Sequence, residues 1–214
     1  MNKIDYFYYH WGPYLFKTKA PQHIIDKLKI AGKKTKIQLN DLASHQPHQY
    51  AYPSDIQAWF FKEISEIMDI YLRGSIEYHG TALPEVFPKL ELINLWINYM
   101  EPGDFTPGHI HAGALSFVIF LDIPNELDKE YHDYDGTMLR PGSLSFIYAL
   151  QLESQWATNR QEIHPKTGDM YIFPSMLEHT VVPFKSNVTR ISVSGNFRVV
   201  NKEEVSPRDS IWFA

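Results

Sequence analysis

Cysteine is absent from the 214-residue sequence. Its absence excludes disulfide bonds, thiolate zinc sites and cysteine nucleophiles, so a bound metal would have to be held by His, Asp or Glu. The sequence also lacks any run that approaches the ~20 apolar residues of a membrane-spanning helix. Its aromatic N-terminal stretch lacks the apolar core of a signal peptide. These absences lead us to expect a cytoplasmic protein.

An excess of positive charge is lacking as well. The chain has 20 Lys and Arg residues against 25 Asp and Glu residues, a formal net charge of -5, and its basic residues are scattered. This balance argues against a nucleic-acid-binding surface. Hydrophobic residues make up 44% of the chain, which is enough to bury the core of one large domain. We therefore expect a single domain over residues 1–214, with no nucleic-acid or membrane partner.

The spacing of apolar residues predicts helices in the first part of the chain and strands in the rest. One helix is expected over residues 20–34. A stronger one is expected over residues 55–74, with Ser54 as its cap and Gly74 just after its end. After residue 90 the apolar segments are short, with turn signals between them. This order predicts an α+β or mostly-β domain with a sandwich or jelly-roll core over 90–200, preceded by an N-terminal extension with supporting helices over 1–89.

Two polar stretches, residues 36–54 and 125–140, show neither the helical nor the strand spacing of apolar residues and are expected to be loops. Long polar loops with aromatic residues are candidate lids over a site. Surface loops without a function are the alternative interpretation of both stretches.

Three histidines form a pattern that is typical of a metal site. His109 and His111 lie two residues apart, so on a strand both imidazoles point to the same side and can reach one ion at ~2 Å. A mononuclear site needs at least one more protein ligand. His179, in "MLEHTVVPF" near the end of a predicted strand, is the best candidate. The alternative is an ordinary surface loop with two stray histidines and an unrelated third.

The last predicted strand, "VTRISVSGNFRVV", alternates between polar and apolar residues. Arg190, Ser192 and Ser194 share one face, and Ile191 and Val193 share the other. Either the polar row faces water, or helices cover the apolar row and the polar row lines an internal pocket. A buried Arg190 would need an anionic partner. That partner could be a structural acidic residue, or the far carboxylate of a dicarboxylate that chelates the metal, with the Ser192 hydroxyl as a further donor.

Taken together, these residues resemble the iron(II)/2-oxoglutarate-dependent oxygenases, and within them the prolyl-4-hydroxylase-like members. The chain is most similar to microbial and viral oxygenases that carry Trp-x-Asn, His-x-His, Phe-Pro before a distal His, and then Arg-x-Ser-x-Ser-x-Asn. The resemblance covers about residues 90–200. The matching positions are Trp96, Asn98, His109, His111, Phe173, Pro174, His179, Arg190, Ser192, Ser194 and Asn196.

The resemblance implies a double-stranded β-helix, a jelly-roll core with the N-terminal helices packed outside. It implies iron(II) bound by His109, His111 and His179, and 2-oxoglutarate that chelates the iron and pairs with Arg190. Ascorbate is a candidate supporting reductant. The implied activity is hydroxylation of a C–H bond, in a prolyl residue or a small molecule, with O2 consumed and succinate and CO2 released. Further candidate cofactor-binding residues are Ser192, Tyr99 and Asn98.

Two features depart from the family pattern or complicate it. The ferrous oxygenase site usually has two histidines and a carboxylate, and the carboxylate position is His111 here. A neutral imidazole there removes one negative charge and weakens the electrostatic hold on the metal. Asp104 is a fallback ligand and Asp169 a poorer one. On a regular strand Tyr99 points away from Asn98, so only one of the two lines the pocket unless a bulge lets both contribute.

Two other functions stay open at this point. A cupin-like dioxygenase could use three histidines without 2-oxoglutarate, although such a site would not need Arg190. A non-catalytic jelly-roll binding module is favoured by the missing carboxylate.

Overall fold

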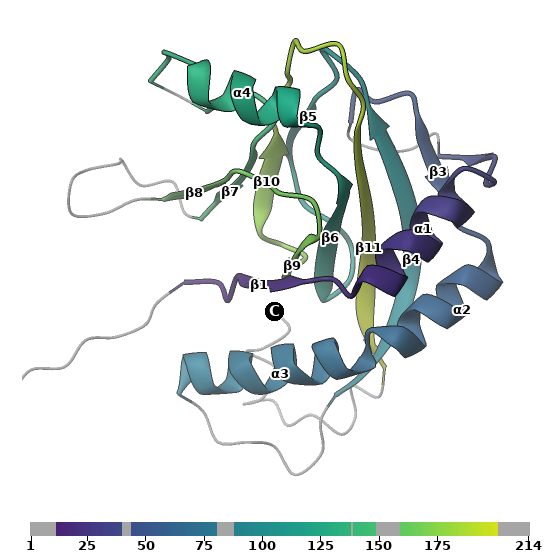
Figure 1. Cartoon of the computed structure of the whole chain (residues 1–214). Coiled ribbons are helices and arrows are strands. Elements are labelled where there is room, and N and C mark those ends of the chain that lie inside the picture. Colours follow the sequence, from purple (N-terminus) through teal and green to yellow (C-terminus); the bar gives the residue numbers. More distant parts are fainter. Residues whose placement is uncertain (1–11, 40–43, 81–87, 138, 149–158, 201–214) are drawn as a thin grey trace, which may run out of the picture.

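A computed structural model describes the chain over residues 12–39, 44–80, 88–137, 139–148 and 159–200. Two antiparallel sheets in this part of the chain pack against each other, as Figure 1 shows. The larger sheet contains, in spatial order, β1 (Phe16–Lys19), β9 (Asp169–Pro174), β6 (Leu115–Asp122), β11 (Arg190–Val200), β4 (Lys89–Met100), β3 (Gln49–Ala51) and β2 (Ile37–Gln38). The smaller sheet contains β5 (Thr106–His109), β10 (Glu178–Val181), β7 (Leu144–Ile147) and β8 (Arg160–Ile163). The predicted jelly roll is confirmed.

Side-chain alternation gives the larger sheet two different faces. Ile97 of β4 and Val193 of β11 are fully buried on the outer face, in a cluster with residues of α1 (Gln22–Gly32), α2 (Ser54–Glu63) and α3 (Ser65–His79). The three helices cover this side of the sheet in Figure 1. The inner face contributes Phe120 and Phe173 to a second cluster shared with the smaller sheet. The functional interpretation of the β11 pattern therefore holds, because helices cover its apolar row.

The helix predicted over residues 55–74 is two helices, and its predicted end was wrong. The chain bends at the buried Ile64, with φ -94° and ψ 2°, and α3 then continues through Gly74 to His79. Gly74 does not end the helix; a Cβ at this position would collide with the hydroxyl of Tyr14. Gly80, with φ +67°, is the left-handed residue that ends α3.

Both stretches predicted as polar loops contain regular structure. The stretch 36–54 contributes β2 and β3, so the N-terminal part of the chain extends the sheet as well as supplying helices. The stretch 125–140 contains α4 (Asn125–Asp133), of which only Leu127 is buried. Strands of two or three residues and a helix with one buried side chain show too little apolar periodicity to be found from sequence. No helix in the described part of the chain combines the length and apolarity needed to cross a membrane.

Candidate metal centre

The register of the smaller sheet brings two of the three histidines together. His109 of β5 and His179 of β10 are directly paired across the strands, and their ring centroids are 4.2 Å apart. His111 lies just beyond the end of β5, where its backbone N–H donates to the Ser175 carbonyl at 2.9 Å. The potential ligand atoms of the three imidazoles all lie within 4.8 Å of one another. The structure therefore gathers the whole predicted set at one place.

Hydrogen bonds fix which ring nitrogen is available in two of these histidines. Nδ1 of His109 donates to the Pro107 carbonyl at 2.8 Å, and Nδ1 of His179 donates to the Leu177 carbonyl at 2.9 Å. A carbonyl only accepts, so each Nδ1 carries the proton and each Nε2 keeps a lone pair. Backbone carbonyls commonly orient metal-binding histidines in this way.

Burial also keeps the three imidazoles neutral. It lowers the pKa of His179 to about 3 and that of His111 to about 4, in both cases with a smaller contribution from neighbouring histidines. Burial lowers the pKa of His109 as well. Neutral imidazoles are the form that binds metal ions, so no proton has to leave these side chains before an ion binds at neutral pH.

Arg190 is a buried cation without a counter-ion among the described residues. Its side chain is only 3% exposed, and Nε has no hydrogen-bond partner in the part of the chain that the structure describes. Nη1 donates to the sulfur of Met100 at 3.1 Å, and the guanidinium lies 4.9 Å from the centre of the Phe120 ring. Burial lowers the pKa of Arg190 to about 10, which still leaves it charged at neutral pH. A buried unpaired charge is costly, which favours binding of an anion here.

One cavity of about 220 Å³ connects the histidines with Arg190. Apolar side chains such as Phe120 and Leu144 form part of its wall, and no Asp or Glu of the described residues lines it. Ser192, next along the polar face of β11, also lines the cavity, as predicted for a further donor. The lining is therefore neutral apart from the single positive charge of Arg190.

Asn98 holds the polar wall of this cavity together. Its Oδ1 accepts hydrogen bonds from Nε2 of Gln49 at 2.6 Å and from Nε1 of Trp96 at 2.9 Å. Its Nδ2 donates to the hydroxyls of Ser192 and Ser194, each at 3.3 Å. With all its polar atoms engaged, Asn98 orients Ser192 rather than presenting a free group to a ligand.

Tyr99 lies outside the cavity, so the structure does not bring this predicted cofactor-binding residue to the site. β4 is regular around this position, and alternation turns Tyr99 away from Asn98 and toward the helices. There it packs against the outer core cluster and makes an edge contact with the ring of Tyr50, at 6.2 Å between centroids.

The two carboxylates considered as fallback ligands are engaged elsewhere. Asp104 accepts a hydrogen bond from the backbone N–H of Glu101 at 2.9 Å, within the turn before β5. Asp169 pairs with Lys17 at 3.0 Å and Lys19 at 2.6 Å. Neither lines the cavity, which leaves His111 at the position where the family usually has a carboxylate.

Sequence reasoning missed Gln46 and Gln49, two buried amides that line the cavity. Nε2 of Gln46 donates to the hydroxyl of Thr106 at 2.8 Å, which ties this stretch to β5. Both residues lie in a stretch predicted to be a loop. Their amide side chains carry no signal in sequence spacing that would have placed them at the site.

The residues present fit a divalent metal ion with a bound anion. Three neutral nitrogen donors line this cavity together, and a buried guanidinium with an unpartnered Nε lines the same cavity. Imidazole nitrogen suits iron and other first-row transition metals. A ligand with one end on the metal and a carboxylate on Arg190 would satisfy both charges.

Residues 94–196 match the model of a family described as "Putative 2OG-Fe(II) oxygenase". This core belongs to the 2OG-Fe(II) oxygenases. The matched segment includes the histidine pair, the distal histidine and Arg190, so the predicted family is confirmed on the residues that suggested it. Iron(II) and 2-oxoglutarate are therefore the cofactors of the oxygenase core, with O2 as co-substrate. A comparison with curated proteins gives no sequence match.

Solved oxygenase structures share the fold of this core. The viral collagen prolyl hydroxylase of Paramecium Bursaria Chlorella virus-1 is 15% identical with a TM-score of 0.55, covering 88% of this chain and 98% of its own. A prolyl-4-hydroxylase of Pseudomonas putida is 15% identical with a TM-score of 0.51, covering 86% and 91%. A 2OG-Fe(II) oxygenase family oxidoreductase of Burkholderia pseudomallei is 12% identical with a TM-score of 0.56, covering 86% and 85%. At these identities the similarity concerns the double-stranded β-helix fold alone.

Proposed function

We propose that the protein is a 2-oxoglutarate- and iron(II)-dependent dioxygenase that hydroxylates a C–H bond, with a three-histidine metal site. His109, His111 and His179 would hold the iron, and Arg190 would bind the far carboxylate of 2-oxoglutarate. The observation that carries this assignment is the buried, unpaired Arg190 in the same cavity as three neutral imidazoles.

Each side chain has a defined task in this assignment. Bound iron(II) and 2-oxoglutarate supply the oxidation, in which 2-oxoglutarate loses CO2 to become succinate and one oxygen atom enters the substrate. Nε2 of His109 and Nε2 of His179 would bind the ion, because backbone carbonyls hold the opposite ring nitrogens. Arg190 orients 2-oxoglutarate through a charge-assisted pair, and the hydroxyl of Ser192 is a further donor. Phe120 and Leu144 limit water in the cavity.

The charge balance distinguishes this site from the usual one. Three neutral histidines add no negative charge, and no acidic residue among the described ones lines the cavity. The two carboxylates of 2-oxoglutarate would then provide the negative charge inside the cavity, beside the iron and Arg190. We expect the iron to bind more weakly without 2-oxoglutarate than with it, because the anion offsets both positive charges.

A succinate assay tests the proposed function. The purified protein is supplied with iron(II), 2-oxoglutarate and O2, and succinate is measured with and without iron. We expect iron-dependent succinate, absent from the His179→Ala variant and present in a control in which His23, an exposed side chain of α1, is replaced by Ala. Iron binding without an effect of 2-oxoglutarate would instead support a three-histidine dioxygenase that does not use it. Binding of both cofactors without succinate, in the presence of candidate substrates, would support a non-catalytic module.

We further propose peptidyl proline as the first substrate class to test. Two similar solved structures are named as prolyl hydroxylases, and the sequence resembles that group. A proline-rich peptide should increase succinate formation and gain 16 Da on one prolyl residue, in line with insertion of one oxygen atom. A matched peptide with alanine in place of proline is the control. Equal stimulation by both peptides would contradict the prolyl specificity, and no stimulation by either would favour a small molecule as the substrate class.

A further inference from the structure

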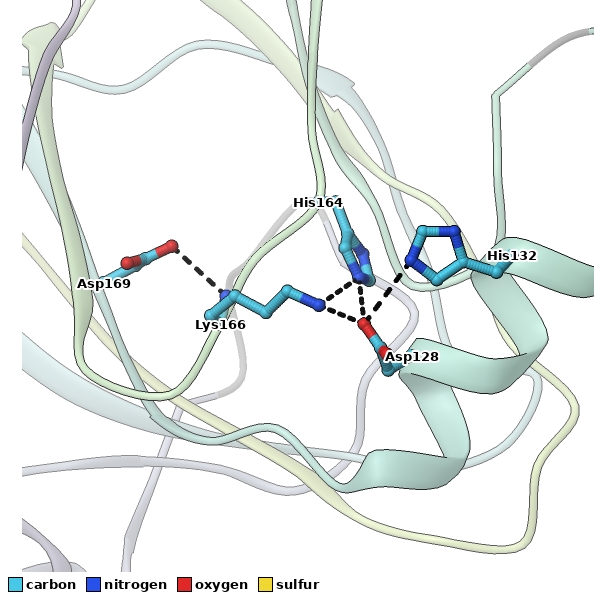
Figure 2. Close-up of polar contacts among 5 residues, drawn as sticks. All are labelled: Asp128, His132, His164, Lys166 and Asp169. Carbon is cyan, nitrogen blue, oxygen red and sulfur yellow. Dashed lines mark hydrogen bonds and ion pairs between the residues drawn. The ribbon is translucent and has the colours of Figure 1, made fainter.

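A second group of metal-binding side chains lies on a different part of the molecule. Asp128 and His132 come from α4, and His164 follows β8, as Figure 2 shows. Oδ1 of Asp128 lies 2.7 Å from Nε2 of His164 and 3.8 Å from Nε2 of His132. The three potential ligand atoms all lie within 4.8 Å of one another. None of these residues lines the cavity of the oxygenase site.

The fold holds these side chains in place. Asp128 and His132 are four residues apart on a helix, so they share one face. His164 is only 16% exposed, and its ring stacks on that of Tyr131 with 3.8 Å between centroids and 22° between planes. Leu127 of the same helix is buried in a cluster with Met100 and Phe184. These two contacts fix the distance between the helix and the connection that follows β8.

The helix is tied down at a third point. The carboxylate of Glu130 accepts hydrogen bonds from the backbone N–H groups of Lys185 and Ser186, both at 2.8 Å, and from the Ser186 hydroxyl at 2.6 Å. The Asp128 and His132 side chains are thus presented from an anchored helix rather than from a freely moving loop.

Lys166 lies inside this group and creates a conflict. Its Nζ contacts Oδ1 of Asp128 and lies 2.7 Å from Nε2 of His164. Nε2 of His164 would have to donate a proton to Asp128 and also accept one from Lys166, and one nitrogen cannot do both at once. If Nε2 of His164 carries no proton, its lone pair faces Oδ1 of Asp128 at 2.7 Å, and this contact is favourable only with a cation beside both atoms. The Lys166 ammonium group is such a cation, but it can only donate hydrogen bonds to the two atoms, whereas a metal ion would accept electron pairs from both.

We propose that Asp128, His132 and His164 form a second binding site, for a divalent transition-metal ion of the zinc class, and that Lys166 competes with the ion for this position. Two imidazoles and a carboxylate form a known zinc donor set, which leaves a fourth position for water. Donors on a tetrahedral zinc ion lie roughly 3.4 Å apart, given bonds of ~2.0–2.2 Å. The spacing from 2.7 to 4.8 Å brackets this value, so small side-chain rotations would suffice.

A bound ion would join α4 to the connection between β8 and β9. It would relieve the conflict at His164, because an ion accepts electron pairs from all three donors while the Lys166 side chain turns into solvent. An ion that binds only the folded state also stabilises it.

Zinc titration of a variant without the oxygenase site isolates this second site. In a His109→Ala/His179→Ala background, we expect one equivalent of Zn²⁺ to bind in calorimetry and to raise the melting temperature. Adding His164→Ala should weaken this binding by more than ~100-fold, because even an outer partner of a metal ligand contributes ~10–100-fold. Adding His23→Ala, an exposed histidine on α1, should leave the binding unchanged.

A Lys166→Ala variant in the same background should bind Zn²⁺ several-fold more tightly. A gain in affinity cannot arise from misfolding, so this variant keeps the test decisive if a histidine variant unfolds. The proposal is overturned if the background binds no zinc, if His164→Ala leaves the affinity unchanged, or if Lys166→Ala weakens it. The zinc signal is read without iron or 2-oxoglutarate, so these outcomes do not depend on the proposed oxygenase function.

Discussion

His179 lies directly opposite His109 in the β10–β5 pair, and each side chain is oriented by the carbonyl of the residue two positions before it. Their relation is set by strand register, because a slip of one residue would turn either imidazole to the other face of the sheet. His111 stands just outside this pair, beyond the end of β5. Two of the three donors are therefore fixed by the sheet, and the third depends on a short connection.

The first prediction concerns His111. Replacing it with Asp restores the negative charge that the family usually places there, next to a divalent ion. Opposite charges about 4 Å apart attract by on the order of 1–4 kcal/mol in partly solvated surroundings, so His111→Asp should tighten iron(II) binding by about tenfold or more. His111→Ala should weaken it. Anaerobic titration measures both, and an unchanged affinity in His111→Ala would remove His111 from the ligand set.

A second prediction concerns the close approach of α3 to residue 14. Glycine to alanine in the middle of a helix usually stabilises by about 0.5–1 kcal/mol. Gly74→Ala should instead destabilise the protein by roughly 1 kcal/mol, because its Cβ would meet the Tyr14 hydroxyl. The ring of Tyr14 is held by Tyr71 and Tyr78, at 5.3 and 5.2 Å between centroids, which limits its escape.

Urea unfolding of a double-mutant cycle checks this explanation. Tyr14→Phe removes the hydroxyl, so Gly74→Ala should lower the free energy of unfolding by less in the Tyr14→Phe variant than in the wild type. A Gly74→Ala variant that is more stable than the wild type would contradict the proposed contact.

The third prediction is a pH dependence of stability from Asp169. Burial by itself would raise the pKa of this carboxyl, but hydrogen bonds from Lys19 and Lys17 outweigh it and hold the pKa below its usual range. A lowered folded-state pKa stabilises the protein above the unfolded-state value of about 3.9, and this contribution is lost as the pH falls through the folded-state pKa. Asp169→Asn should therefore lower the free energy of unfolding by about 1–2 kcal/mol at pH 7. The effect is limited to this size because both lysines are more than half exposed, so that solvent screens the two ion pairs.

The free energy of unfolding, followed from pH 7 down to pH 3, tests this sign. The difference between wild type and Asp169→Asn should shrink as the pH falls below about 5, since the carboxyl of the unfolded wild-type chain takes up a proton before that of the folded protein does. An exposed carboxylate on α3, replaced as Asp69→Asn, serves as the control. A difference that stays constant down to pH 3 would show that the charge of Asp169 contributes nothing.

The sequence predicted those site residues that follow the alternation of side chains along a single strand. The alternation from Arg190 to Ser194 follows from the two-residue period of a strand and leads to the cavity. The His109–His111 spacing was interpreted with the same period, but His111 lies beyond the end of β5 and reaches the cavity from a short connection. The distal His179 could be proposed only as a third ligand, because its pairing with His109 depends on the register between strands far apart in the chain.

Other features could not be predicted because their causes are tertiary. Gln49 lies on β3, a three-residue strand that lacks an apolar alternation of its own and is held by pairing with β4. Gly74 is typical of a helix end, but here it allows Tyr14 to approach. Asp128 and His164 are 36 residues apart, and only the packing of α4 places them together. In each case the deciding contact joins segments that no local pattern connects.

The most direct test of the three-histidine oxygenase site is an anaerobic titration with iron(II) followed by 2-oxoglutarate, monitored by the visible charge-transfer band of the iron–2-oxoglutarate chelate. The wild type should bind one iron and develop the band when 2-oxoglutarate is added. His179→Ala should lose the band, and Arg190→Ala should keep the iron but bind 2-oxoglutarate at least ~10-fold more weakly, since a charge-assisted pair contributes ~1.5–3 kcal/mol. Iron binding without a band in the wild type, or an unchanged 2-oxoglutarate affinity in Arg190→Ala, would contradict the assignment.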